Sequence, residues 1–282
     1  MFFPCIHNAQ VFGKLVDSES LEPISYAVIS WNGGSKGAVS GPEGEFEVVD
    51  REVDSVLISA MAYRDTSVSL KSFGNSEIII YLNRQTYDLP IIEVKSGYFT
   101  RMEFEVSNRK KTSLGTASIK FNFFIGTEFA NDQLGYIESV SIFFDRARSK
   151  NLEHEVIFRL RILGFNDDNY PEYDLLTEFV EIMPERRNRW LTIDLKDNNV
   201  RLPDRNFLVA VEYIKKPDLK AKGEPKVFSS GWSIGLSEIP TDQKGLRQMW
   251  DNLDGDSWGK SPNFPIENVA PMIKVSAMVL KP

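Results

Sequence analysis

The chain has 282 residues, of which 42% are hydrophobic and 26% charged, and its formal net charge is -7. This balance is typical of a folded, water-soluble chain with room for two domains. The acidic charge argues against nucleic acid as a partner, because neutralising phosphates requires clustered Lys and Arg. A single cysteine, Cys5, excludes an intramolecular disulfide. No stretch is apolar over the roughly 20 residues that a transmembrane helix needs.

The opening stretch, residues 1–10, begins with apolar residues and ends with small and polar ones. Two interpretations stay open: the end of a truncated secretory leader, or an irregular start of the chain. The first predicts a periplasmic, outer-membrane-associated or extracellular protein. Cleavage near Gln10 would leave the mature chain without cysteine, which suits an oxidising compartment.

Residues 11–94 carry short apolar runs with a period of two, separated by glycine-bearing turns. This pattern is typical of antiparallel β-structure. Strands are expected at 11–16, 27–31, 45–49, 55–60, 66–70 and 77–82. The turns at 32–34 and 41–44 contain glycines, which permit the positive φ angles of tight turns. We therefore predict a small β-sandwich.

Three segments of this block carry a family pattern: residues 13–17, residues 22–30 and residues 41–46, which end in Gly-Glu-Phe. Together they resemble the carboxypeptidase-regulatory-like domain, a transthyretin-like β-sandwich. One departure from the family pattern is Ala62 before Tyr63, where relatives usually have Gly. The resemblance implies that the first domain is a non-catalytic sandwich.

Residues 95–114 are expected to form a linker or a first edge strand, and residues 115–282 a second, larger β-sandwich. Its predicted strands are 117–125, 135–144, 155–164, 190–195, 206–214, 228–235 and 272–280. Segments 126–140, 158–163 and 190–195 resemble a jelly-roll, galactose-binding-like module that accompanies such domains in envelope proteins of Gram-negative bacteria. The overall fold class is thus all-β, with two sandwiches.

The segment 158–163 alternates strictly between apolar residues and arginines. Neighbouring side chains on a strand face opposite sides of the sheet. We therefore expect Phe158 and the residues in phase with it to be buried, and Arg159 and Arg161 to point to water.

Two loops of the second domain are rich in acidic residues: 166–174 and 251–258. Calcium prefers oxygen ligands from flexible loops, so Asp167, Asp168, Asp254 and Asp256 are candidate calcium ligands. Ordinary turns also prefer Asp and Asn, and neither loop has the register of an EF-hand. Calcium is the only cofactor that the sequence suggests.

Aromatic residues gather in the second domain. Trp190 and Trp232 lie on predicted strands and are expected in the core, where a large ring buries much area. Four other aromatic residues are expected in loops and, with Asp174, form a candidate carbohydrate-binding surface: Tyr170, Tyr173, Trp250 and Trp258. Loop aromatics also cap the ends of sandwiches, and that interpretation stays open.

The sequence contains few candidate catalytic residues. The two histidines are His7 and His154, whereas a catalytic zinc needs about three converging ligands. The neighbours of His154, Glu153 and Glu155, would face the other side of an extended strand. No Gly-x-Ser-x-Gly motif is present. We therefore expect a chain that is not an enzyme.

The sequence as a whole predicts a binding or structural module of the cell envelope, with a glycan or an envelope protein as its partner. One alternative is a glycan-active enzyme that uses two carboxylates about 5 to 9.5 Å apart. Another is an accessory subunit of an outer-membrane assembly. An exposed apolar patch or an unprotected sheet edge would indicate such a subunit.

Overall fold

The computed structural model describes residues 11–49, 53–71, 77–85, 97–106, 110–118, 122–146, 156–184, 189–215, 228–239, 249–251, 259–260 and 268–281. Within these ranges the regular structure is β-strand, apart from the 3-10 turn η1 (Lys196–Asn198). The predicted all-β fold class is confirmed. None of these ranges contains a helix that could cross a membrane.

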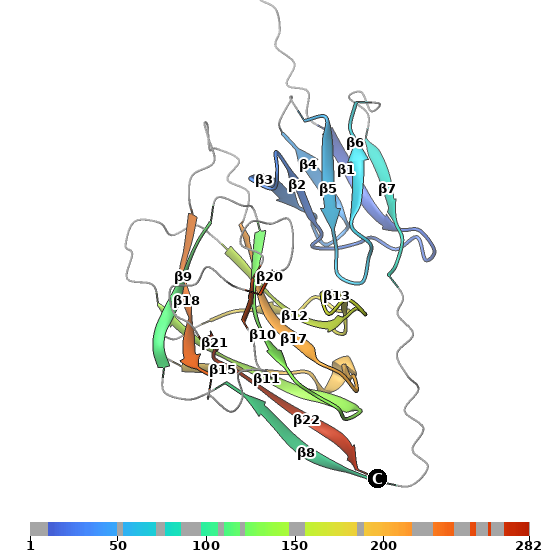
Figure 1. Cartoon of the computed structure of the whole chain (residues 1–282). Helices are drawn as coiled ribbons and strands as arrows, with labels where there is room; N and C mark the ends of the chain where they lie inside the picture. The colour runs from blue at the N-terminus through green and yellow to red at the C-terminus, as the bar shows by residue number, and fades with distance from the viewer. Residues whose placement is uncertain are drawn as a thin grey trace, which may run out of the picture. The chain divides into compact units, whose positions relative to one another are not determined.

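Contacts between residues divide the chain into two compact units (Figure 1). The described residues of unit 1 lie between 11 and 85, and those of unit 2 lie between 97 and 215 and between 228 and 281, with the gaps given above. The stretch expected to be a linker or first edge strand, 95–114, contains β8 (Tyr98–Glu105), which pairs with the last strand of unit 2.

Unit 1 is built from two sheets, in the orders β4-β1-β7 and β3-β2-β5-β6. Its strands are β1 (Val11–Asp17), β2 (Val28–Trp31), β3 (Lys36–Val39), β4 (Glu45–Val48), β5 (Ser55–Ser59), β6 (Thr66–Ser69) and β7 (Ile78–Leu82). The inward side chains form one apolar core that includes Leu15, Ile29 and Ile58. Gly13 lies opposite Phe46. A Cβ atom at Gly13 would come within 2.4 Å of the Phe46 ring, so glycine gives this ring its place in the core.

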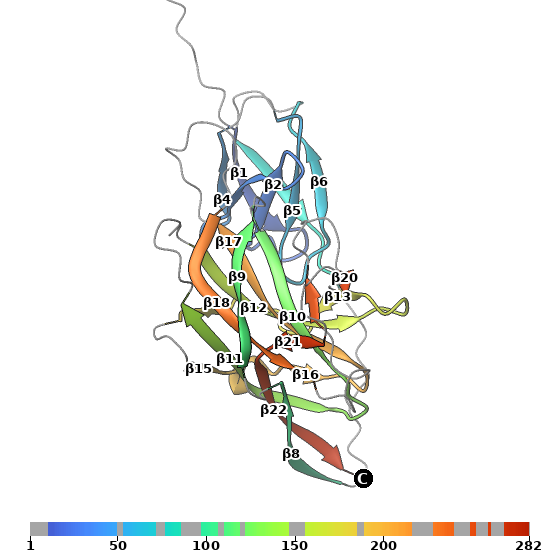
Figure 2. The same ribbon diagram turned by 60° about the vertical axis from the view of Figure 1, so that its left-hand side comes forward.

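Unit 2 contains a seven-stranded and an eight-stranded sheet. The first has the order β13-β12-β17-β10-β19-β20, with β14 beside β12. The second has the order β21-β18-β11-β22-β8, with β15 and β16 beside β11 and β9 beside β18, as Figure 2 shows. The strands not yet delimited are β9 (Lys110–Ser118), β10 (Asn122–Phe129), β11 (Gly135–Arg146), β12 (Val156–Phe165), β13 (Pro171–Asp174), β14 (Glu181–Ile182), β15 (Arg189–Asp194), β16 (Arg201–Leu202), β17 (Phe207–Lys215), β18 (Phe228–Glu238), β19 (Met249–Asp251), β20 (Gly259–Lys260), β21 (Val269–Pro271) and β22 (Ile273–Lys281).

Aromatic rings fill the core between these two sheets. Phe104 of β8 meets Phe207 of β17 edge to face, with 5.3 Å between ring centroids. Phe144 of β11 meets Phe158 of β12 in the same way, at 5.9 Å. Rings that meet across the space between layers contribute large buried areas and favourable edge contacts. These contacts make unit 2 a sandwich.

The prediction that Arg159 and Arg161 point to water is wrong. Both side chains are buried, because β12 lies inside the sheet and both of its faces are covered. Arg159 donates through Nε to the buried carboxylate of Glu212 on β17. Arg161 donates to both carboxylate oxygens of Asp174, at 2.7 and 3.0 Å. The alternation marked the two faces correctly, but both faces are interior.

The expectation that Trp190 and Trp232 lie in the core also needs correction, since both are half-buried. The ring of Trp190 meets Phe143 edge to face, and the Lys274 ammonium lies 4.8 Å from its centroid. A cation over an indole face is favourable at a partly exposed site. Trp190 therefore belongs to the outer surface of the eight-stranded sheet.

Candidate functional site

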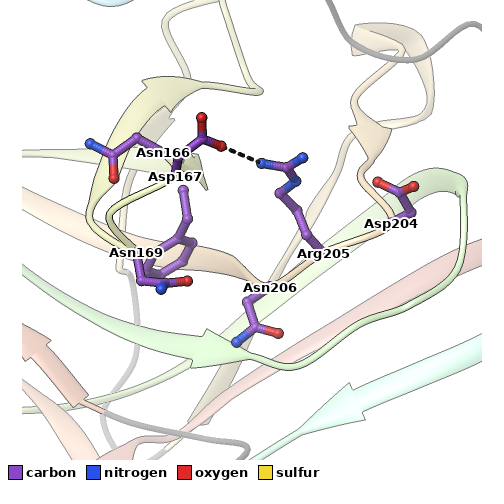
Figure 3. A pocket seen from close by; sticks show the side chains of 7 residues that line it. Asn166, Asp167, Asn169, Asp204, Arg205 and Asn206 are labelled. Atoms are coloured by element: carbon purple, nitrogen blue, oxygen red, sulfur yellow. Dashed lines mark ion pairs between the residues drawn. The ribbon is translucent and has the colours of Figure 1, made fainter.

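A polar depression of about 460 Å³ lies on unit 2 (Figure 3). One wall is the loop that joins β12 to β13, and the other is the turn that leads into β17. The residues that line it are Phe165, Asn166, Asp167, Asn169, Asp204, Arg205 and Asn206. A concave site with a few placed polar groups is the usual form of a small-ligand site.

The loop of the first wall is held in shape by Asn166. Its Oδ1 atom accepts hydrogen bonds from the backbone N–H groups of Asp168 and Tyr170, both at 3.0 Å. Asn169 adopts a left-handed conformation with φ of 60°, which Asn tolerates better than most residues. These local bonds hold the backbone of the loop in one conformation.

The charges of the depression are mixed. Asp167 and Arg205 point toward each other across it (Figure 3), with Oδ1 and Nη1 3.8 Å apart. Both side chains are exposed, so this ion pair contributes little to stability and remains accessible to a ligand. Asp204 adds a second carboxylate beside Arg205.

A buried tryptophan supports the loop from beneath. Trp250 lies in β19 and is 1% exposed. Its ring meets Phe165 and Tyr170 edge to face, at 5.5 and 6.0 Å. Tyr170 is 51% exposed, so one part of its ring rests on the tryptophan while another part faces solvent.

Glu128 ties this support to the second wall. Its carboxylate is buried and accepts a hydrogen bond from Trp250 Nε1 and another from Asn206 Nδ2, both at 2.7 Å. Hydrogen bonds to a charged acceptor are among the stronger ones. Glu128 therefore fixes Trp250 and Asn206 together and is itself occupied by structural bonds.

The structure corrects three of the predicted positions. Trp250 is a strand residue, because β19 pairs with β10, and its side chain is buried in an apolar cluster with Phe165 and Leu208. Tyr173 lies in β13, where its ring covers Gly164: a Cβ atom there would come within 2.2 Å of the ring. Burial raises the pKa of the Tyr173 hydroxyl. Asp174 is turned inward to Arg161 and does not line the depression.

Asp167, Asp168 and Tyr170 lie in the loop where the sequence placed them. Trp258, Asp254 and Asp256 lie outside the described residues, as do His7 and His154. The described residues contain no group of three His, Cys, Asp or Glu side chains suited to a metal ion. Arg205 beside Asp167 also opposes a divalent cation, since like charges repel at this range. Calcium binding therefore stays a prediction without a described ligand set.

The second wall, Asp204 to Asn206, was not predicted. Its only signal in the sequence is a polar turn after Pro203 and before an apolar strand. Such turns are common, and nothing in the chain order indicates that this one lies beside the loop at 166–170.

Comparisons with protein-family models and with curated proteins find no match. The solved structures that this chain resembles include a clostridial cysteine protease after propeptide cleavage, with 8% identity and a TM-score of 0.37, covering 90% of this chain and 66% of that one. Another is the VP2 subviral particle of infectious bursal disease virus, with 10% identity and a TM-score of 0.30, covering 100% and 63%. The chain thus spans less than two thirds of either structure's length. Likenesses at this level assign no family.

Proposed function

We propose that this protein is a non-catalytic binding module that takes a carbohydrate in the polar depression of unit 2. The observation that carries the proposal is the half-exposed ring of Tyr170, which follows the wall residue Asn169 in the same loop and rests on buried Trp250. The walls of the depression add amides, carboxylates and a guanidinium. A sugar presents apolar C–H groups to an aromatic face and hydroxyls to polar side chains. Sites that combine a few placed polar groups with aromatic surface suit such a ligand.

The charge of the depression indicates the class of sugar. Asp167 and Asp204 face a single cation, Arg205. The surplus of negative charge repels carboxylated, sulfated or phosphorylated sugars. Neutral sugars and amino sugars are therefore the proposed ligands.

The proposal also covers the location of the protein and the family of unit 1. The proposed location is the periplasm, the outer membrane or the cell surface, and it rests on the interpretation of residues 1–10 as the end of a secretory leader. Unit 1 is proposed to be a carboxypeptidase-regulatory-like spacer. Its support is the strand that ends at Asp17 and the turn at Gly44, with φ of 75°, that precedes Phe46. Unit 2 is proposed to be the jelly-roll module that presents the ligand site.

A glycan array probed with the full chain, followed by calorimetry on each hit, tests this proposal. Three substitutions remove side-chain groups of the loop that forms the first wall and leave its backbone in place: Tyr170→Ala, Asp167→Asn and Asn169→Gly. Glycine at 169 keeps the left-handed conformation while it deletes the amide. We expect each to weaken binding by about tenfold, the loss that one or two hydrogen bonds or a ring contact would cause.

Tyr81→Ala is the matched control, because Tyr81 is an equally exposed tyrosine, 54% against 51% for Tyr170, on β7 of unit 1. It should leave binding unchanged. Absence of any hit among neutral and amino sugars, or hits that all three variants retain, would contradict the proposal. Hydrolysis of a glycan that Asp167→Asn abolishes would instead support an enzyme.

A further inference from the structure

Strand β8 forms an edge of the eight-stranded sheet. It ends the order β21-β18-β11-β22-β8, and no described strand pairs with its outer side. Figure 1 shows it lying along β22. Its pairing with β22 runs without a register shift from Tyr98 to Glu105. A regular edge of this length is a ready template for another strand.

The backbone groups that face outward can be identified. Val106, directly after β8, donates its N–H to the carbonyl of Ile273, so its peptide groups face the neighbouring chain segment. Residues of an antiparallel strand face alternate sides with their hydrogen-bonding groups. The backbone N–H and C=O groups of Phe104 and Met102 therefore face β22 as well. Arg101 and Glu103 direct their N–H and C=O groups to the open edge.

The edge has few of the devices that prevent pairing. Proteins guard exposed edges with charged side chains, especially Lys, with Pro or with a bulge. β8 reads YFTRMEFE and contains no Lys or Pro, its pairing with β22 has no bulge, and its charges are of both signs. Its first residues, Tyr98 and Phe99, are exposed aromatics. Phe99 also lines an apolar groove of about 380 Å³ with Tyr136 and Met278.

The charges of β8 complement those of a second copy of the same strand. Arg101 and Glu103 are exposed and flank Met102. Antiparallel pairing about Met102 places Arg101 of each copy opposite Glu103 of the other. Sliding the register by two residues in either direction would place Arg101 opposite Arg101, or Glu103 opposite Glu103. Opposite charges across strands stabilise a pair and like charges destabilise it, so one register is favoured.

We propose that β8 is a self-association edge, through which two copies of this chain pair antiparallel about Met102 and join two sheets into one. The two central Arg101–Glu103 pairs would exchange about four backbone hydrogen bonds. Their side chains would add two ion pairs on the outer face. In the free chain Arg101 contacts Glu138 at 2.9 Å and is largely exposed, so its guanidinium can reach both carboxylates. The interface is of the small, reversible kind.

Sedimentation velocity on the full chain, at concentrations up to about 100 µM, is the test because weak interfaces populate in this range. We expect a monomer–dimer equilibrium. Arg101→Glu and Glu103→Arg should each raise the dissociation constant by about tenfold, since each places like charges opposite one another twice. The double variant, with both changes, should return it to within about threefold of the original.

Two further variants separate pairing from folding. Glu103→Pro removes an N–H that faces the open edge, which an edge strand tolerates, and should abolish the dimer while the thermal unfolding midpoint stays within a few degrees. Glu138→Gln removes the partner of Arg101 within the chain and should leave the dimer intact. A chain that stays monomeric at the highest concentration, or a double variant that fails to recover association, would overturn the proposal.

Discussion

The two units bury charge in different ways. In unit 1 the carboxylate of Asp17, at the end of β1, is buried, but its partner Arg84 is half exposed. The backbone N–H groups of Glu19 and Ser20 and the hydroxyl of Tyr63 donate to the same carboxylate. This cluster is one carboxylate surrounded by hydrogen-bond donors at the edge of the sandwich, where solvent can reach Arg84.

In unit 2 both signs of charge are inside. The side chains of Arg159 and Glu212 are only 2% and 1% exposed, and Arg161 lies between Glu212 and Asp174. These two guanidinium groups and two carboxylates form an interior network whose positive and negative charges are equal in number. Asn122 adds a hydrogen bond to Glu212 at 3.1 Å. A cluster at the margin can use water to complete its solvation, whereas the interior network of unit 2 depends on its own charge balance.

The largest effect is expected from Glu212→Gln. Burial favours a raised pKa for Glu212, but the charges of Arg159 and Arg161 outweigh it and hold the pKa below its ordinary value. Glutamine keeps the shape and removes the negative charge, so the network retains an unbalanced buried cation. Such a change costs about 3 to 5 kcal/mol of unfolding free energy. Urea denaturation, monitored by hydrogen exchange in peptides of β17, would measure this loss of unfolding free energy.

Asp194→Asn is the control for this prediction, because Asp194 is an exposed carboxylate of unit 2 that pairs with Lys196 at 3.6 Å. It should cost less than about 0.5 kcal/mol. An equally small cost for Glu212→Gln would mean that the interior network does not depend on its charge balance.

A smaller effect, confined to unit 1, is expected from Asp17→Asn. Burial favours a raised pKa for Asp17, but hydrogen bonds from Ser20, Tyr63 and Glu19 and from Arg84 lower it well below its ordinary range. We expect a cost of about 2 kcal/mol at pH 7, because asparagine cannot replace the charge-assisted bonds. Hydrogen exchange in peptides of β1 and β7 would report it separately from unit 2.

The pH dependence of this cost has a definite sign. A carboxylate whose pKa is lower in the folded state stabilises the fold above its unfolded pKa of about 3.9. The contribution disappears as the pH falls from about 4 toward the folded-state pKa. The difference in unfolding free energy between the original protein and the Asp17→Asn variant should therefore be constant from about pH 5 to 8 and shrink below about pH 4. A difference that persists unchanged at lower pH would show that the charge is not responsible.

The sequence predicted the fold class because alternation and glycine turns are local signals. It predicted the loop of Asp167 and Tyr170 for the same reason. It placed Arg159 and Arg161 in water because alternation identifies two faces but not what covers the second one. Trp250 was assigned to a loop because β19 is only three residues long, too short to show a period. Asp204 was missed because its place beside Asp167 depends on sheet order, which no local pattern encodes.

The smallest effect concerns how unit 1 brings Tyr63 to Asp17. Ala62 has a φ of 63°, in the left-handed region that costs a residue with a Cβ atom about 1 to 2 kcal/mol. Glycine avoids this cost but loses about 0.5 to 1 kcal/mol of backbone entropy. Ala62→Gly should therefore raise the unfolding free energy of unit 1 by about 0.5 kcal/mol, whereas Ala38→Gly, in regular β3, should lower it.

The pKa of Tyr63, which burial and the hydrogen bond to Asp17 raise to about 12, should be the same in both variants when followed by ultraviolet titration. A destabilised Ala62→Gly variant would mean that the backbone of this turn is not strained. The hydrogen bond from Tyr63 to Asp17 would then form without a cost in backbone conformation.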